Sequence, residues 1–219
     1  MEVIAFDSYG TLFDVAAVRA ALEGRVADPA RCAALWRQKQ IEYSTMVSLM
    51  GRWQDFWALT GLALDYAAAV HQLTLSAHDR EELLGTWHRL PLYSDVAPAL
   101  ARLGVRSQLA ILSNGSMPML EAVLRHNGIW ERFVSVCSAD EVRVFKPSPR
   151  IYALLAQRVG RPADAILFVT SNGWDAVGAK AAGLRVAWAN RQGMPLDPLG
   201  LIPDYEVPDL IALADRLGM

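Results

Sequence analysis

An aspartate, Asp7, stands directly after the short apolar run of residues 3–6. Such a run is typical of a buried strand, and a carboxylate at its end is costly to bury unless hydrogen bonds and a cation compensate for lost water. Gly10 and Thr11 can supply backbone donors and a hydroxyl, and Lys146, one of only three lysines, can supply the cation. A carboxylate held in this way is suited to act as a covalent nucleophile. Considered alone, however, Asp7 is better explained as an aspartate that satisfies a turn.

Other polar stretches follow further apolar runs, which lie at residues 109–112, 133–136, 166–169 and 186–188. Helical stretches near residues 118–126, 149–159 and 174–182 separate these runs. Strands that alternate with helices predict a parallel sheet covered on both faces. Because ligands of such sheets bind beyond the carboxyl ends of the strands, the stretches of interest are residues 7–14, 113–116 and 170–175. Lys146 precedes the helical stretch at 149–159.

One long segment interrupts the alternation of strands and helices. From about residue 15 to residue 89 the pattern is helical, with a long stretch at 29–50 and several more between 53 and 87. The sequence therefore predicts an α/β fold with two parts: a doubly wound, Rossmann-like parallel sheet core of residues 1–14 and 91–219, and a helical cap of residues 15–90 inserted after the first strand. So many consecutive helices disfavour the alternative, an ordinary stack of crossover helices.

Length and composition limit the classes of function. The 219 residues are enough for one core with a modest insertion, and a net charge of −2 gives no reason to expect nucleic acid or an anionic membrane surface as a partner. Cys32 and Cys137 form neither a disulfide framework nor a metal motif, which favours two buried residues in a reducing compartment. No apolar run approaches the roughly 18–20 residues of a membrane span, and the N-terminus has no features of a secretory signal. A cytoplasmic protein is expected.

Four short stretches, taken together, change the interpretation of Asp7. Residues 7–14 (DSYGTLFD) resemble the first signature of the haloacid dehalogenase superfamily, and residues 112–115 (LSNG) resemble its second. Lys146 with Pro147 resembles the third, and residues 171–175 (SNGWD) resemble the fourth. Each stretch is a weak signal alone, but four in the right order at expected strand ends are a strong one. The family fold is a doubly wound core with a cap, in agreement with the pattern above.

Tyr9 distinguishes this chain from the phosphatases of that superfamily. They place a second aspartate two residues after the nucleophile, where it serves as general acid and base and as a magnesium ligand. Tyrosine has a reference pKa of about 10 and is neutral near pH 7; without the acid an alkoxide is difficult to protonate, whereas halide leaves without a proton. With Asp175 expected to pair with Lys146, the magnesium site is incomplete. We therefore expect no metal and no cofactor.

Two further stretches resemble the cap of the L-2-haloacid dehalogenases, namely residues 35–43 (LWRQKQIEY) and 48–52 (SLMGR). In that family the arginine of the cap helix receives the departing halide, and Arg37 is a permanent cation suited to this task. The resemblance implies hydrolysis of short L-2-haloalkanoic acids to D-2-hydroxy acids. The partners it implies are the 2-haloacid substrate, water and the halide product, together with a second copy of the chain in a homodimer built partly from cap helices.

The resemblance also implies a mechanism. Asp7 attacks the carbon that bears the halogen, inverts it and forms an ester, which water then hydrolyses. Arg37 and Asn114 would stabilise the halide, Ser113 would hold the substrate carboxylate, and Asp175 would position or deprotonate the water, assisted by Thr170 and Asn172. The residues matched to catalytic positions are Asp7, Thr11, Arg37, Ser113, Lys146, Tyr152, Thr170, Asn172 and Asp175. Those matched to the substrate and halide pocket are Tyr9, Arg37, Gln38, Phe56, Ser113, Asn114 and Trp174.

Three other functions stay open at this point. A related hydrolase could use the same nucleophile on another carbon–heteroatom bond, for example to open the ring of azetidine-2-carboxylate. A magnesium-dependent small-molecule phosphatase of the same superfamily is the second alternative. A non-catalytic binding module is the third, but it predicts decay of the catalytic set, and Asp7, Arg37, Lys146 and Asp175 are all present.

Overall fold

A six-stranded parallel sheet forms the centre of the molecule. The computed structural model describes residues 2–219, so Met1, the first residue of the predicted core, lies outside it. The strands are β1 (Glu2–Phe6), β2 (Ser107–Ser113), β3 (Phe133–Ser138), β4 (Ile166–Thr170), β5 (Arg185–Ala189) and β6 (Tyr205–Val207). Their order in the sheet is β3-β2-β1-β4-β5-β6, and every neighbouring pair is parallel. This doubly wound α/β sheet confirms the predicted fold class.

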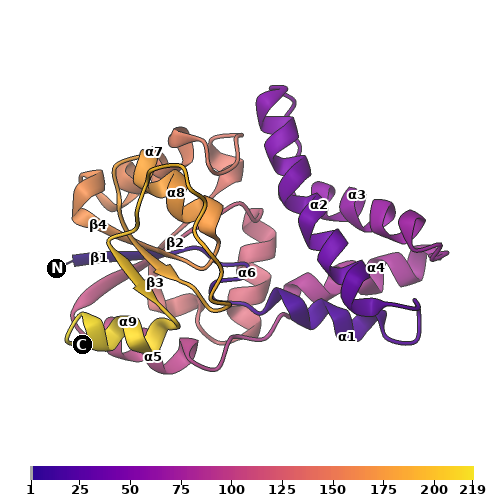
Figure 1. Ribbon diagram of the computed structural model, residues 1–219, viewed down its shortest axis with the longest axis horizontal. Helices are drawn as coiled ribbons and strands as arrows, with labels where there is room; N and C mark the ends of the chain where they lie inside the picture. Colours follow the sequence, from indigo (N-terminus) through magenta and orange to yellow (C-terminus); the bar gives the residue numbers. More distant parts are fainter. Residues whose placement is uncertain (1) are drawn as a thin grey trace.

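Helices cover both faces of the sheet, with α7 and α8 on one side and α5 and α9 on the other (Figure 1). These helices of the sheet region are α5 (Val96–Leu103), α6 (Met117–His126), α7 (Pro149–Val159), α8 (Gly173–Ala181) and α9 (Leu210–Arg216). Because both faces are covered, residues 3–6 of β1 and 166–169 of β4 are almost fully buried. Sequence order reverses between β1 and β4, the place where doubly wound sheets bind ligands.

The segment between β1 and α5 is helical and lies to one side of the sheet (Figure 1). It contains α1 (Val18–Leu22), α2 (Pro29–Leu49), α3 (Phe56–Val70) and α4 (Ala77–Gly85). Side-chain caps fix where the long helices start: the Asp28 carboxylate accepts from the Arg31 N–H before α2, and the Asp55 carboxylate accepts from the Ala58 N–H before α3. Two 3-10 turns, Val15–Ala17 and Thr86–His88, lie at the two ends of this segment, and elsewhere in residues 2–219 further 3-10 turns lie at Trp130–Arg132, Ala139–Glu141 and Ala163–Ala165.

The two chain connections between the sheet and the helical segment run side by side. The Asp14 N–H donates to the Pro91 carbonyl at 2.9 Å, and the Tyr93 N–H donates to the Leu12 carbonyl at 3.1 Å. A β-bridge joins Phe13 to Leu92 between them. The segment therefore leaves and rejoins the sheet at one place, next to the carboxyl end of β1.

Candidate active site

Asp7 lies at the carboxyl end of β1 with its side chain surrounded by donors. Its Oδ1 accepts from Lys146 Nζ at 3.0 Å. Its Oδ2 accepts from Thr11 Oγ1 and from Asn172 Nδ2, each at 2.9 Å. Thr11 Oγ1 in turn accepts from the Ser171 N–H at 2.8 Å, which directs its single proton at Asp7. These contacts stabilise the carboxylate of a residue that is only 6% exposed.

Lys146 joins Asp7 to a second buried carboxylate, Asp175. Its ammonium donates to Asp175 Oδ2 at 2.9 Å, and neither of these two side chains is exposed. Tyr152 Oη donates to Asp175 Oδ1 at 2.6 Å. Burial, with a smaller contribution from Asp7, raises the pKa of Asp175 above its ordinary value, although the Lys146 ammonium and the Tyr152 hydroxyl oppose the rise. Asp175 is therefore a better proton acceptor than an exposed carboxylate.

Arg37 reaches the same site from α2. Its Nη2 donates to the Tyr9 carbonyl at 3.1 Å, and its Nη1 donates to Gln40 Oε1 at 3.2 Å. Burial lowers the pKa of Arg37, and the Asp7 carboxylate opposes this shift. The helical segment thus brings a guanidinium to the end of the sheet that carries Asp7.

A small inner cavity lies between the sheet and the helical segment. Its walls are Asp7, Tyr9, Arg37, Ile41, Phe56, Ser113, Asn114, Asn172 and Trp174. The centre of a water molecule can move through only about 10 Å³ of it, so it has room for about one water. Asn114 Oδ1 accepts from the Lys146 N–H at 2.8 Å, while its Nδ2 is buried with no partner among residues 2–219. The cavity wall therefore carries an unused donor, suited to an anion.

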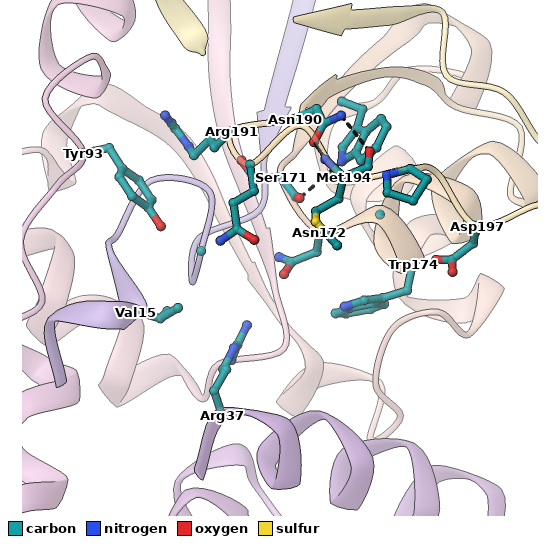
Figure 2. Close-up of a pocket in the computed structure, with 15 residues that line it drawn as sticks. Val15, Arg37, Tyr93, Ser171, Asn172, Trp174, Asn190, Arg191, Met194 and Asp197 are labelled. Atoms are coloured by element: carbon teal, nitrogen blue, oxygen red, sulfur yellow. Dashed lines mark hydrogen bonds between the residues drawn. The ribbon is translucent and has the colours of Figure 1, made fainter. Parts of the chain in front are cut away.

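A larger outer cavity of about 380 Å³ adjoins the inner one, and Arg37, Asn172 and Trp174 line both. Figure 2 shows Arg37 pointing from its helix into this space, with Ser171 and Asn172 on the other side. These shared residues lie between the small space at Asp7 and the larger space beside it.

Ser113 and Thr170, both matched to catalytic positions by resemblance, make no hydrogen bond to Asp7. Ser113 Oγ lies 2.5 Å from Ser8 Oγ and accepts from the Gly115 N–H at 3.0 Å, although Ser113 does line the inner cavity. Thr170 is fully buried, and its Oγ1 accepts from the Asn172 N–H at 3.2 Å. Thr170 therefore shapes the loop that carries Asn172, and it is not among the residues that line the inner cavity.

The expectation that Gln38 lines the pocket was wrong. Its side chain is exposed and borders a separate hollow with Leu35, Tyr66 and His71. Successive residues of a helix point about 100° apart, so with Arg37 turned towards Asp7 the next residue turns away. Ile41, one turn after Arg37, lines the cavity instead. The spacing of four residues from Arg37 was the signal that could have identified it.

The side chains of the site are poorly suited to bind a magnesium ion. Within residues 2–219 no three His, Cys, Asp or Glu side chains are grouped as metal ligands. Asp7 and Asp175, the two carboxylates that could bind a cation, share the Lys146 ammonium. Burial raises the pKa of Tyr9, so this hydroxyl is neutral and cannot replace a carboxylate ligand. The donor set therefore does not fit the ion.

Comparisons with known proteins all indicate the same family. The family model for haloacid dehalogenase-like hydrolases matches residues 1–183. An (S)-2-haloacid dehalogenase of Pseudomonas sp. (strain YL) is 42% identical over 214 residues, which cover 97% of this chain and 92% of the relative. Haloacetate dehalogenase H-2 of Moraxella sp. (strain B) is 40% identical over 221 residues, covering 100% and 99%.

A solved structure, the L-2-haloacid dehalogenase from Xanthobacter autotrophicus with chloropropionic acid covalently bound, superposes with a TM-score of 0.92. It is 35% identical, and the match covers 100% of this chain and 98% of that one. Fold, site and similarity together make the chain a hydrolase. It belongs to the haloacid dehalogenase-like hydrolase family, as its four motifs predicted.

Proposed function

We propose that the protein hydrolyses short L-2-haloalkanoic acids to D-2-hydroxy acids and halide. The observation that carries the proposal is a buried carboxylate, Asp7, on the wall of a small cavity that is also lined by Arg37 and by Asn114, whose buried Nδ2 donor has no partner among residues 2–219. A carboxylate opposite anion-binding donors suits displacement of an anionic leaving group. The names of the relatives, and the chloropropionic acid bound covalently in the Xanthobacter enzyme, support the same reaction.

In the first step an Asp7 oxygen attacks the carbon that carries the halogen and inverts it. Oδ1 accepts one hydrogen bond, whereas Oδ2 accepts two, so we assign the attack to the less occupied Oδ1. The carbon–halogen bond breaks as the ester bond forms, and the halide leaves with the bonding electrons. Arg37 and Asn114 are assigned to the halide, because donors already in position stabilise charge that develops in the transition state.

In the second step water attacks the Cγ of the Asp7 ester and passes a proton to Asp175, whose raised pKa suits it to accept one. Thr11 and Asn172, which donate to Oδ2, then stabilise the oxyanion that forms there. The tetrahedral intermediate expels the oxygen attached to the substrate, and this oxygen takes up the proton. The hydroxy acid leaves, the second proton of the attacking water is released from Asp7 to solvent, and Asp7 returns as a carboxylate beside Lys146.

The predicted division into a core of residues 1–14 and 91–219 and a cap of residues 15–90 belongs to the same proposal. Each part contributes a different wall of the inner cavity: Asp7 and Asn114 come from the sheet side, and Arg37, Ile41 and Phe56 come from the helical segment. The two adjacent connections between the parts are suited to a hinge. Since the cavity has room for about one water, we infer that the cap moves to admit substrate, and that only short chains fit when it closes. A cytoplasmic location, which the two buried free cysteines favour, is part of this proposal.

The activity itself is tested by halide release. With L-2-chloropropionate we expect chloride and D-lactate in equal amounts, no reaction with the D enantiomer, and no loss of rate after dialysis against EDTA. Chloride is measured by ion chromatography and the hydroxy acid by chiral chromatography. Activity that disappears on chelation and returns with magnesium would contradict the proposal. Hydrolysis of p-nitrophenyl phosphate, or ring opening of azetidine-2-carboxylate without chloride release, would favour one of the alternatives.

We also propose that two copies of the chain pair through α2 and α3. The outer faces of these helices expose Met46, Met50, Leu62 and Tyr66 around a groove of about 430 Å³. Exposed apolar side chains gathered around one groove suit a contact with another protein surface, and the resemblance implies a homodimer built partly from cap helices. We expect sedimentation at the mass of a dimer, and at the mass of a folded monomer for Leu62→Glu. A monomeric unsubstituted protein at micromolar concentration would refute the pairing.

Within residues 2–219 no helix is long and apolar enough to cross a membrane.

A further inference from the structure

Gln40 is a polar side chain in an apolar place. It lies between α2 and α3, fully buried, on the same face of α2 as Trp36. An amide without partners at such a position costs free energy, and a leucine would pack there without that cost. The Gln40 amide, however, makes hydrogen bonds at both its oxygen and its nitrogen. The geometry of these bonds indicates what the buried amide does.

The hydrogen bonds form a chain from Thr60 through Gln40 to Arg37, and the Thr60 hydroxyl determines which atom donates in each of them. Thr60 Oγ1 donates its only proton to the Phe56 carbonyl at 2.7 Å. Thr60 Oγ1 must then accept from its other neighbour, and Gln40 Nε2 donates to it at 2.9 Å. With its nitrogen committed to Thr60, the Gln40 amide presents its oxygen to Arg37, whose Nη1 donates to it at 3.2 Å. No flipped amide satisfies all three bonds.

We propose that Gln40 and Thr60 are positioning residues that hold the Arg37 guanidinium in the orientation needed to receive the departing halide. The inference rests on the proposed dehalogenase function and extends it to two residues that line neither cavity. Arg37 is held at two points, by Gln40 Oε1 at one terminal nitrogen and by the Tyr9 carbonyl at the other. Two anchors fix both the position and the plane of the fork. The remaining N–H donors of the five are then free for an anion.

A role confined to stability is the competing explanation. The same bonds join α2 to α3, and Trp36 Nε1 adds another by donating to the Thr60 carbonyl at 2.9 Å. If the chain of bonds only joined the helices, its loss would lower the melting temperature and reduce activity with every halogen alike. A positioning role predicts a loss that depends on the leaving group, because a poorer leaving group needs more stabilisation in the transition state.

The first experiment compares Gln40→Met and Thr60→Val with the unsubstituted enzyme on L-2-chloropropionate and L-2-bromopropionate. We expect kcat to fall about ten- to a hundredfold with the chloro acid. Losses of this size are typical when a residue that orients a metal-binding side chain is removed, and Gln40 orients Arg37 in a similar way. The fall should be smaller with the bromo acid, and KM should change little. Thr60→Ser retains the hydroxyl and should retain most of the rate.

Two control variants match the chemistry of the changes. Thr45 Oγ1 donates to the Ile41 carbonyl at 3.1 Å within α2, so Thr45→Val removes the same kind of helix bond without the onward link to Arg37. Gln157 is exposed on α7, so Gln157→Met makes the same replacement away from the site. Both should retain the full rate with either acid. Melting temperatures are measured for every variant. If Gln40→Met does not fold, Thr60→Val alone tests the inference, because valine keeps the shape of threonine.

A double-mutant cycle with Arg37→Lys then tests whether the effect passes through Arg37. Once the guanidinium fork is gone, Gln40→Met should cost little more, so the two effects should not add. Equal losses with both halogens, additive effects in the cycle, or an unchanged rate would each overturn the inference. An unsubstituted enzyme that releases no halide from any 2-haloacid would instead contradict the proposed function, and this is measured first.

Discussion

Replacing Lys146 with methionine is expected to abolish halide release and to destabilise the folded protein at neutral pH. The ammonium lies 3.0 Å from Asp7 and 2.9 Å from Asp175, with its side chain fully buried. Methionine fills a similar volume but leaves two buried carboxylates without their shared cation. Breaking a buried ion pair by removing one partner typically costs about 3–5 kcal/mol. One carboxylate should therefore take up a proton, and the site would lose the charge arrangement on which the proposed attack depends.

The pH dependence of stability distinguishes this explanation from simple loss of packing. The pKa of Asp175 is already raised by burial, and removing the opposing Lys146 raises it further. Between the unfolded pKa of about 3.9 and this raised folded pKa, the folded state binds more protons than the unfolded state, so its stability falls as pH rises. We therefore expect the difference in unfolding free energy between variant and unsubstituted protein to be larger at pH 8 than at pH 5. Urea unfolding at the two pH values measures this difference.

Lys180 provides the matched control for this prediction. It pairs with Asp204 at 2.9 Å, but both side chains are partly exposed, and an ion pair of this kind is worth about 1 kcal/mol or less. Lys180→Met should leave activity unchanged and give a nearly pH-independent difference in stability over the same range. If Lys146→Met gave the same pH-independent difference, its ammonium would not be the group that keeps the two carboxylates charged.

Four of the six strands could be predicted because a parallel sheet buries its inner strands on both faces, so that β1, β2, β4 and β5 read as nearly continuous apolar runs. The edge strand β3 was predicted as well, although it is only partly buried, because three of its first four residues are apolar. The edge strand β6 was missed because its three residues, Tyr205–Val207, are partly exposed and include Glu206. The short helix α9 was missed with it, although Asp209 caps its start. A strand this short, with a charged residue at its centre, does not give an apolar run that a sequence pattern detects.

The sheet side of the candidate site was predicted better than the helical side. Asp7, Ser113 and Asn172 lie at or just after the carboxyl ends of parallel strands, so the topology alone brings them to one edge of the sheet. On α2 the prediction depends on the rotation of the helix, and the buried face includes the polar Gln40 and Ser44. These polar residues blur the apolar periodicity that would have fixed the rotation. Gln38 was assigned to the pocket by its match to the cap helix of the L-2-haloacid dehalogenases, and no periodicity was available to correct this match or to single out Gln40, two positions further on.

Asp7→Asn is expected to lose halide release by about a thousandfold or more, because a neutral amide is a poor nucleophile and the proposed reaction passes through a covalent ester. The amide keeps the size of the side chain and can still accept a hydrogen bond from Lys146 Nζ or Thr11 Oγ1. A melting temperature that falls far less than the activity would assign the loss to chemistry. The variant tests whether Asp7 is needed, but it does not reveal what the carboxylate attacks.

Isotopic labelling in heavy-oxygen water identifies what the Asp7 carboxylate attacks. If Asp7 attacks the substrate carbon, the hydroxyl oxygen of the first product comes from its own carboxylate. A single turnover with enzyme in excess should then give unlabelled hydroxy acid and place one heavy oxygen on the peptide that contains Asp7, as mass spectrometry can measure. Later turnovers should carry the label into product. A carboxylate that only activated water would label the product in the first cycle and leave Asp7 unlabelled. Both routes invert the carbon, so stereochemistry cannot distinguish them. Label in the first product would therefore refute the ester mechanism even for an enzyme that releases halide, because the atom delivered to carbon would have come from solvent.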